Sequence, residues 1–412
     1  METRRTPSSA GVRRPRESTP PSRTAVGGQP GVPARIPFNR PTIVGRELYY
    51  ISQAIHEGHS AGDGRFSRQC QAWLERELGV PKVLLTTSCT DALEMAAALL
   101  DISPGDEVVV PSFTFVSTVN AFVLRGAVPV FVDIRPDTLN MDERLLEPLI
   151  TARTKAVVPM HYGGVGCEMD EIGAIAARRG IAVVEDNAHG LLARYRGKRL
   201  GSFGTLAAQS FHETKNFGCG EGGALVVNDS RFVLRAEIIR EKGTDRSRFF
   251  RGEVDKYTWV DIGSSHLPSD ILAAFLYAQL EARESIQARR REIWERYFDG
   301  LERWAAGRGA RLPVVPDHCD QSYHLFYVIM PSAESRQGLI RHLGGQGIQA
   351  VFHYVPLHLS PMGHRLGGGP APAACPVTEE ISERIVRLPF YYDLAGQDQA
   401  RVIEAVKAFR GR

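Results

Sequence analysis

Short runs of β-branched residues alternate with helical patterns between residues 82 and 186, and this alternation limits the folds open to the chain. The strand-like runs are KVLLTT (82–87), EVVVP (107–111), VPVFVDI (128–134), KAVVPM (155–160) and IAVVED (181–186). The helical patterns between them cover residues 90–100, 112–124, 142–150 and 168–179. Short apolar strands separated by helices are typical of a mostly parallel sheet with helices on both faces. We therefore predict an α/β fold.

A second, smaller domain is expected after the sheet. Residues 269–301 form one long helical stretch, amphipathic at first and strongly charged later, which suits a connector between domains. The chain then mixes the strand-like run HLFYVIM with two helical patterns, SRQGLIRHLGGQG and DQARVIEAVKAF. We predict a basic tail at residues 1–35, a large α/β domain at 36–275, and a connector helix with a small α+β domain at 276–412.

Charge and composition exclude several classes of protein. Residues 1–35 carry a net charge of +5 within a chain total of +3, so the remainder is slightly acidic, which argues against nucleic-acid binding. The tail is rich in Pro, Ser, Gly and Arg and is expected to be disordered. No apolar run reaches the roughly 18 residues of a membrane helix. The six cysteines are widely spaced, without a C-x-x-C pair, which favours a reduced, cytoplasmic protein with no metal site.

Polar and aromatic residues follow the first two predicted strands, at the edge where ligands bind in open parallel sheets. The hydroxyl-rich segment TTSCTDAL begins a helix, where exposed N–H groups and the helix dipole favour an anion. The same segment also fits a plain helix cap formed by Ser88 or Thr90. Phe115 follows the second strand and either covers a flat ligand or packs in the core. Both alternatives stay open at each position.

Two ionisable residues follow later strands. Asp186 ends the run IAVVED, where a carboxylate needs a partner or a proton, and His189 lies three residues on. These two residues also fit a helix cap with a surface histidine. Lys215 lies in SFHETKNFGCGEGG, directly after the strand-like GTLAAQ. It is either a surface lysine on a connection or an amine held in a pocket for chemistry.

Together these residues supply a phosphate cradle, an aromatic ring, a carboxylate and a lysine, in chain order and at strand ends. Pyridoxal phosphate needs such a set, because it carries a phosphate, a flat ring, a pyridine nitrogen that works best protonated, and an aldehyde that condenses with lysine. We therefore expect this cofactor, with pyridoxamine phosphate as its intermediate form.

The chain resembles the DegT/DnrJ/EryC1/StrS family of sugar-nucleotide aminotransferases from about Ile36 to its C-terminus. The motifs that carry the resemblance are FHETKN, GCGEGGALVVND, EDNAHG, PSFTFVSTVNAF and GSSHLPSDILAAFLYAQL. Within the family it is most similar to the dTDP-4-dehydro-6-deoxyglucose 4-aminotransferases, through IREKGTDRSRFFRGEVDKYTWVDIGSS and VFHYVPLH. The resemblance implies a fold-type-I enzyme whose large domain binds pyridoxal phosphate.

The resemblance also implies roles for individual residues. Lys215 would hold the cofactor covalently and act in catalysis with Asp186, which would pair with the pyridine nitrogen, while Phe115 would stack on the ring. The phosphate would be held by Cys89, Thr90, Asp91 and Ser210. His189 would face the cofactor's 3-hydroxyl. Ser265 stands where most members have an asparagine that reaches the partner subunit's phosphate. Six residues lie in segments similar to the family's substrate-binding segments: His161, Arg246, Tyr257, His353, Tyr354 and His358. The three histidines among these six also fit ordinary polar loop positions.

The reaction implied is amino transfer from L-glutamate to the 4-keto group of a nucleotide-activated 4-keto-6-deoxyhexose, in a homodimer with shared sites. A sugar-nucleotide 3-aminotransferase is an alternative. A dehydratase of the same fold is another, but that branch carries histidine in place of Lys215. A regulatory DNA-binding protein has only the basic tail in its favour. A glycine-rich-loop nucleotide enzyme is not favoured either, because no G-x-G-x-x-G follows a strand and opens a helix.

Overall fold

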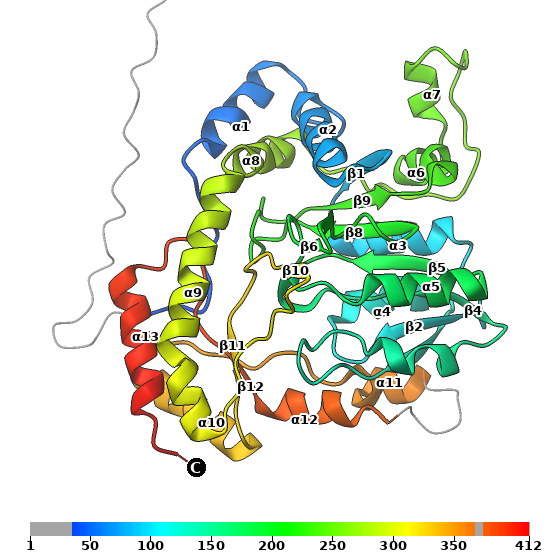
Figure 1. The fold of residues 1–412 in the computed structure, drawn as a ribbon. Coiled ribbons are helices and arrows are strands. Elements are labelled where there is room, and N and C mark those ends of the chain that lie inside the picture. The colour runs from blue at the N-terminus through cyan, green and yellow to red at the C-terminus, as the bar shows by residue number, and fades with distance from the viewer. Residues whose placement is uncertain (1–34, 367–373, 412) are drawn as a thin grey trace, which may run out of the picture. The chain divides into compact units, whose positions relative to one another are not determined.

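A seven-stranded sheet forms the centre of the fold, in a computed structural model that describes residues 35–366 and 374–411 (Figure 1). The strand order is β1-β9-β8-β5-β4-β2-β3. The strands are β1 (Lys82–Thr86), β2 (Glu107–Pro111), β3 (Val128–Val132), β4 (Thr154–Val157), β5 (Ala182–Asp186), β8 (Leu206–Ser210) and β9 (Gly223–Val227). All neighbouring pairs are parallel except those that β9 makes with β1 and β8. The predicted mostly parallel α/β fold is confirmed.

Helices cover both faces of the sheet because successive strand residues point in opposite directions. On one face, Val108 and Val110 pack with α3 (Cys89–Leu99), α4 (Val116–Val123) and α6 (Val233–Arg240). On the other, Val109 packs with α5 (Met169–Arg179). The β1–β9 end of that second face packs against α2 (Arg65–Leu78) and α8 (Asp270–Glu281). The strands are therefore apolar on both sides, as the sequence runs indicated.

The C-terminal part has its own apolar cluster, around Tyr297, Phe326 and Val386. It is built on α9 (Arg283–Arg308), α10 (Ala333–Gly345), α13 (Gly396–Ala408) and the strand pair β11 (Tyr327–Ile329) and β12 (Ile385–Arg387). The remaining α-helices and strands of the described residues are α1 (Glu47–His56), α7 (Arg246–Phe250), α11 (Pro361–Leu366), α12 (Pro376–Arg384), and the short strands β6 (Arg194–Tyr195), β7 (Lys198–Arg199) and β10 (Cys319–Asp320). The predicted domain boundary near residue 275 stays a prediction. The predicted disorder of the tail concerns residues that, apart from Arg35, lie outside the described ones.

Three predicted helices differ from the structure. The helix expected over residues 142–150 is two 3₁₀ turns, Glu143–Leu145 and Glu147–Leu149, because Pro148 lacks the N–H that a continuous α-helix requires. The helix expected from residue 112 begins at Val116. The single stretch 269–301 is two helices, α8 and α9, which meet at Ala282. None of the helices in the described ranges is long and apolar enough to cross a bilayer.

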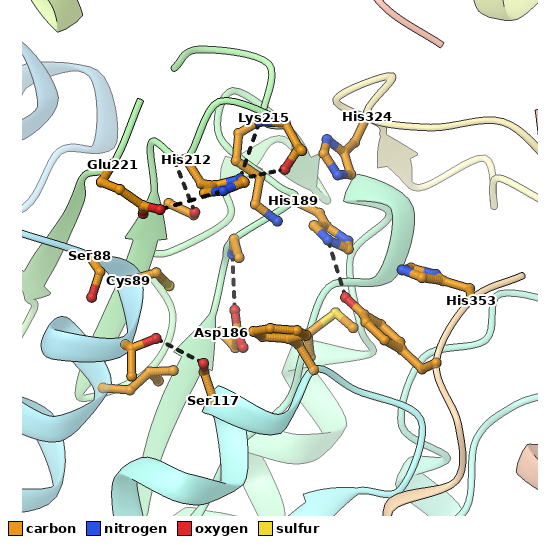
Figure 2. A pocket seen from close by; sticks show the side chains of 18 of the residues that line it. Ser88, Cys89, Ser117, Asp186, His189, His212, Lys215, Glu221, His324 and His353 are labelled. Carbon is orange, nitrogen blue, oxygen red and sulfur yellow. Dashed lines mark hydrogen bonds and ion pairs between the residues drawn. The ribbon is translucent and has the colours of Figure 1, made fainter. Parts of the chain in front are cut away.

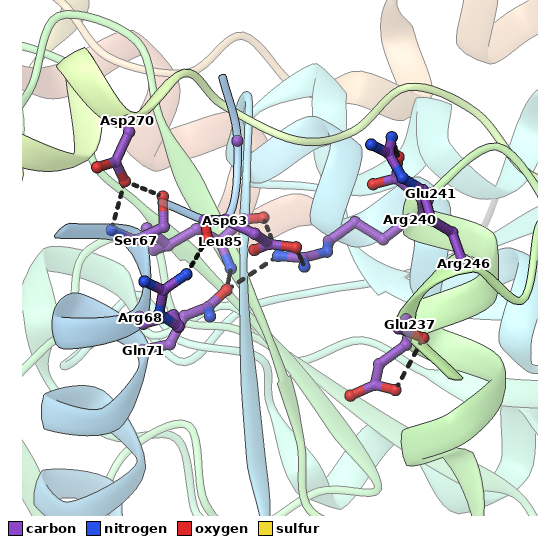
Figure 3. A network of polar contacts seen from close by, with 12 residues as sticks. Asp63, Ser67, Arg68, Gln71, Leu85, Glu237, Arg240, Glu241, Arg246 and Asp270 are labelled. Carbon is purple, nitrogen blue, oxygen red and sulfur yellow. Dashed lines mark hydrogen bonds and ion pairs between the residues drawn. The ribbon is translucent and has the colours of Figure 1, made fainter. Parts of the chain in front are cut away.

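A buried polar network joins helices that are far apart in the sequence (Figure 3). The N-cap of α2 is Gly64, which has no side chain to accept from the first free N–H groups of the helix. Asp270 of α8 accepts instead, from the Ser67 backbone N and the Ser67 Oγ, both at 2.7 Å. A Cβ on Gly64 would lie 2.3 Å from the Asp270 Cγ, so the glycine makes room for this cap. Arg240 of α6 joins the same region by donating to Gln71 and Asp63.

Asp270→Ala should destabilise the fold by about 2–4 kcal/mol, since it leaves buried N–H groups at the start of α2 without their charged acceptor. A lower urea midpoint, followed by circular dichroism, measures the effect. Asp106→Ala is the matched control, because Asp106 accepts from Ser103 in an exposed turn. Equal midpoints for the two variants would contradict the role assigned to Asp270.

Candidate active site

A cavity of about 590 Å³ opens at the carboxyl ends of the parallel strands. Nine of the predicted site residues line it: Cys89, Thr90, Phe115, Asp186, His189, Ser210, Lys215, His353 and Tyr354. Figure 2 shows side chains from both sides of the cavity converging on the space above Asp186. A cavity of this size is typical of sites that bind small molecules or cofactors.

The N-terminus of α3 forms one wall of the cavity. Ser88 caps the helix by accepting from the Asp91 backbone N at 3.0 Å, and Thr90 Oγ1 donates to Ser117 Oγ at 2.8 Å. Cys89 and Thr90 occupy the first turn, where backbone N–H groups have no partner within the helix. Ser210, at the end of β8, adds a further hydroxyl to the cavity lining. This wall offers hydroxyls, amides and a helix dipole to a phosphate. The cap and the anion site predicted as alternatives are therefore compatible.

Asp186 lies at the floor of the cavity with its carboxylate held in place. Its Oδ2 accepts from Thr118 Oγ1 at 2.7 Å and its Oδ1 accepts from the Ala188 backbone N at 3.1 Å. The side chain is 4% exposed, so bulk water does little to stabilise its charge. The carboxylate is thus positioned to stabilise a positive group bound in the cavity.

Lys215 reaches into the cavity from the turn that follows β8 (Figure 2). The turn closes through Lys215 N donating to His212 O at 2.9 Å and Cys219 N donating to Phe211 O at 2.8 Å. Burial lowers the pKa of Lys215 to about 8, although Cys89 and Asp186 act to raise it and Arg387 acts to lower it further. An amine with this pKa is partly neutral near pH 7, so it can act as a nucleophile and as a base.

Three histidines form the wall opposite α3. The ring of His189 stacks on His324 at 4.1 Å between centroids, and His353 stacks on Tyr354 at 3.7 Å. Burial lowers the pKa of each of these histidines well below 6.5. His189 Nδ1 accepts from the Gly163 backbone N at 3.3 Å, which places its proton on Nε2. The three rings are therefore neutral near pH 7 and add no positive charge to the cavity.

Six predicted residues do not line this cavity. Asp91 pairs with His266 beside it, at 3.3 Å. His161 is fully buried and lies 3.0 Å from Glu185, and His358 lies between Ser112 and Glu379. Arg246 begins α7, and Tyr257 and Ser265 follow this helix; all three residues are exposed. What each of them does toward a cofactor or substrate stays a prediction.

Several residues that line the cavity were not among the predicted site residues. Phe38, His212, Glu221, Phe352, His324 and Arg387 are among them. His212 and Glu221 lie within the motifs around Lys215, so their position in the sequence was a usable signal. Phe38, His324 and Arg387 come from segments outside the seven-stranded sheet and far from Lys215 in the sequence, and no local pattern marks them. Within the described ranges, no group of three or more His, Cys, Asp or Glu side chains is arranged to hold a metal ion.

The chain is similar to known proteins over most of its length. Residues 41–407 match the DegT/DnrJ/EryC1/StrS aminotransferase family. The chain belongs to this family. The spore coat polysaccharide biosynthesis protein SpsC of Bacillus subtilis is 31% identical over 90% of this chain and 96% of its own. The aminotransferase TlmJ of Streptoalloteichus hindustanus is 31% identical, with a TM-score of 0.83 over 91% of this chain and 98% of its own. Spr1654 of Streptococcus pneumoniae, solved in its pyridoxal phosphate form, is 28% identical, with the same TM-score and coverage.

The enzyme is therefore a pyridoxal-phosphate-dependent aminotransferase, and the cavity residues fit that cofactor. The α3 wall suits the phosphate, the held carboxylate of Asp186 suits a protonated ring nitrogen, and Lys215 supplies the amine. The expected cofactor, fold type and enzyme class are confirmed.

The cofactor-free protein should combine with pyridoxal phosphate faster as the pH rises from about 6 to about 9, and little faster above that. The neutral amine of Lys215 is the reactive form, and half of it is neutral at its lowered pKa of about 8, so the neutral fraction levels off about one pH unit higher. The gain in absorbance of the bound cofactor measures the rate. An ordinary lysine, with a pKa near 10.4, would give a rate that keeps rising to about pH 10. Lys215→Ala should show no covalent uptake at any pH.

Proposed function

We propose that this enzyme transfers the amino group of L-glutamate to the 4-keto carbon of a nucleotide-activated 4-keto-6-deoxyhexose. The preferred substrate is dTDP-4-dehydro-6-deoxy-D-glucose, and the product is a dTDP-4-amino-4,6-dideoxyhexose for deoxyaminosugar biosynthesis. The observation that carries the proposal is the joint placement of Lys215, Asp186 and the α3 wall in one cavity. The segments similar to the 4-aminotransferases support the substrate, as do two relatives: SpsC acts in polysaccharide biosynthesis, and Spr1654 is assigned as a sugar aminotransferase.

Each residue of the cavity has a distinct part in the proposed reaction. The α3 wall and Ser210 hold the phosphate and so fix the cofactor's position, while Asp186 stabilises positive charge on the ring nitrogen. Pyridoxal phosphate supplies an electron sink that makes the α-proton of the donor acidic. Lys215 would hold the cofactor through a covalent bond to its aldehyde carbon, and its amine, when free of that bond, would carry a proton to and from the donor's Cα. The lowered pKa of Lys215 suits it to this second part, because the amine must be neutral to accept a proton.

The product made from dTDP-4-dehydro-6-deoxy-D-glucose and L-glutamate tests the proposed reaction. We expect the NMR spectrum to show an amine at C4 of the sugar, with 2-oxoglutarate formed in equal amount. Lys215→Ala should lower turnover by at least about 10²–10⁴-fold, the range that proton transfer alone contributes. An amine at C3, or release of water without amino transfer, would contradict the proposed substrate or reaction.

We also propose a homodimer in which each active site draws residues from both subunits. Arg246, Tyr257 and Ser265 do not line the cavity of their own chain. Figure 1 shows α7 projecting beyond α6, and the Arg246 guanidinium there lies over the rings of Phe250 and Tyr257. Large apolar side chains in the same segment are exposed, among them Trp259 at 78%. Such a segment is suited to lie against a second copy of the chain and to reach its cavity.

Co-expressing Lys215→Ala and Arg246→Ala chains tests the shared site. In a mixed dimer, one site receives the intact Lys215 of one chain and the intact Arg246 of the other. Random pairing should therefore restore at most about a quarter of wild-type turnover, although each variant alone is impaired. Turnover no higher than the average of the two separate variants, or an active monomer in sedimentation, would contradict shared sites.

A further inference from the structure

Arg387 reaches the cavity from the C-terminal part of the chain. It ends β12, where its backbone pairs with Tyr327 of β11 and also bridges to Val351. Residues 352–354, which follow Val351, line the cavity beside it. The Arg387 guanidinium lies over the ring of Phe38, 4.6 Å from the centroid. Two backbone pairings and one aromatic ring thus fix the direction in which this side chain points.

This guanidinium has no acidic partner among the described residues. Its Nε is buried without a hydrogen-bond acceptor. The acidic residues that line the cavity are engaged elsewhere, because Asp186 accepts from Thr118 and Ala188, and Glu221 lies 3.7 Å from His212.

Two arginines that are buried elsewhere in the fold have partners. Arg240, whose Nε also lacks an acceptor, donates from its other nitrogens to Gln71 and Asp63, and Arg290 donates to the backbone oxygens of Tyr323 and His324. Arg387 is half-buried, and a cation partly withdrawn from water without an acidic partner costs free energy, so the arrangement around Arg387 favours an anionic ligand.

The surroundings indicate which anion this is. Lys215 and Arg387 are the lysine and the arginine in the cavity lining. Burial lowers the pKa of His189, His324 and His353, so these three rings are neutral near pH 7. The α-carboxylate of an amino acid is attached to the same carbon as the amine that is transferred, so it must lie close to Lys215. The pyrophosphate of a 4-keto sugar nucleotide is on C1, across the sugar ring from the reacting carbon. The cofactor's phosphate is expected at the α3 wall and so does not need Arg387.

We propose that Arg387 binds the α-carboxylate of the amino donor through paired hydrogen bonds from its planar guanidinium. The proposal rests on the proposed function for its donor, L-glutamate, and adds to it the residue that selects an α-amino acid. Arg387 thereby orients the donor's Cα–H bond relative to Lys215. Because 2-oxoglutarate keeps the α-carboxylate of the donor, Arg387 also binds this product before it leaves the cavity.

The test compares Arg387→Met with the matched control Arg384→Met in the cofactor-loaded enzyme. Arg384 ends α12, three residues away, and pairs with Glu380 at the surface, 2.6 Å apart. Calorimetry of 2-oxoglutarate binding gives a readout that does not depend on turnover. We expect Arg387→Met to bind 2-oxoglutarate about 10- to 100-fold more weakly, the range that hydrogen bonds to a charged group contribute. Arg384→Met should bind it as the wild type does.

A donor lacking the α-carboxylate completes the test. In the wild type, 4-aminobutyrate should convert the yellow cofactor form far less readily than L-glutamate does, whereas in Arg387→Met the two donors should differ little. Arg387→Lys, which keeps the charge but not the paired donors, should lie between the wild type and Arg387→Met, and cofactor content confirms that each variant is folded.

Unchanged 2-oxoglutarate binding in Arg387→Met would overturn the proposal, and so would a loss of affinity confined to the sugar nucleotide. An enzyme that reacts with L-glutamate but aminates no sugar nucleotide would overturn the proposed substrate alone, and the binding of 2-oxoglutarate would still decide the role of Arg387.

Discussion

The backbone pairing of β8 is the constraint on which the active site depends. On one side β8 pairs in parallel with β5, which places Asp186 opposite Ala208, two residues before Ser210. On the other side it pairs antiparallel with β9, which places Ser210 opposite Gly223. Because β9 runs in the opposite direction, its first residue lies at the edge where the parallel strands end. The residues that close the loop after Lys215 are thereby returned to the same edge as Asp186.

That pairing also requires a residue without a side chain at one position. A Cβ on Gly223 would lie 2.3 Å from the backbone carbon of Ser88, at the start of α3. Gly223 pairs with Thr86 of β1, the strand that leads into α3, and with Ser210 of β8, the strand that leads into the turn of Lys215. The strand β9 therefore connects α3 with the Lys215 turn. Any larger residue at this position would push α3 away from the sheet and open the phosphate wall. The glycine-rich run in the sequence thus serves packing as well as turn formation.

The charges in the cavity are arranged by burial. The carboxylate of Asp186 is held by hydrogen bonds from Thr118 and the Ala188 backbone N, and burial lowers the pKa of Lys215. The stacked histidines have pKa values far below 6.5, so they provide polar surfaces without competing cations. A cofactor with an anionic phosphate and a cationic ring would meet a helix N-terminus at one end and a carboxylate at the other. This separation of charges suits a single orientation of the cofactor.

The sequence by itself determined the sheet strands other than β9, the helices α3, α5, α10 and α13, and the strand-end positions of Asp186 and Lys215, because period and strand ends are local properties of the chain. The strand β9 was not predicted. It misplaced the start of α4 and merged α8 with α9, since helix ends depend on what packs against them. Tertiary structure alone decided that Phe38, His324 and Arg387 meet Lys215 in one cavity. It also decided that His161 is enclosed beside Glu185. The meeting of Phe38, His324 and Arg387 with Lys215 depends on contacts between segments more than a hundred residues apart in the sequence, and the enclosure of His161 depends on how β5 packs beside the segment after β4. No local pattern records which distant side chain will fill a given space.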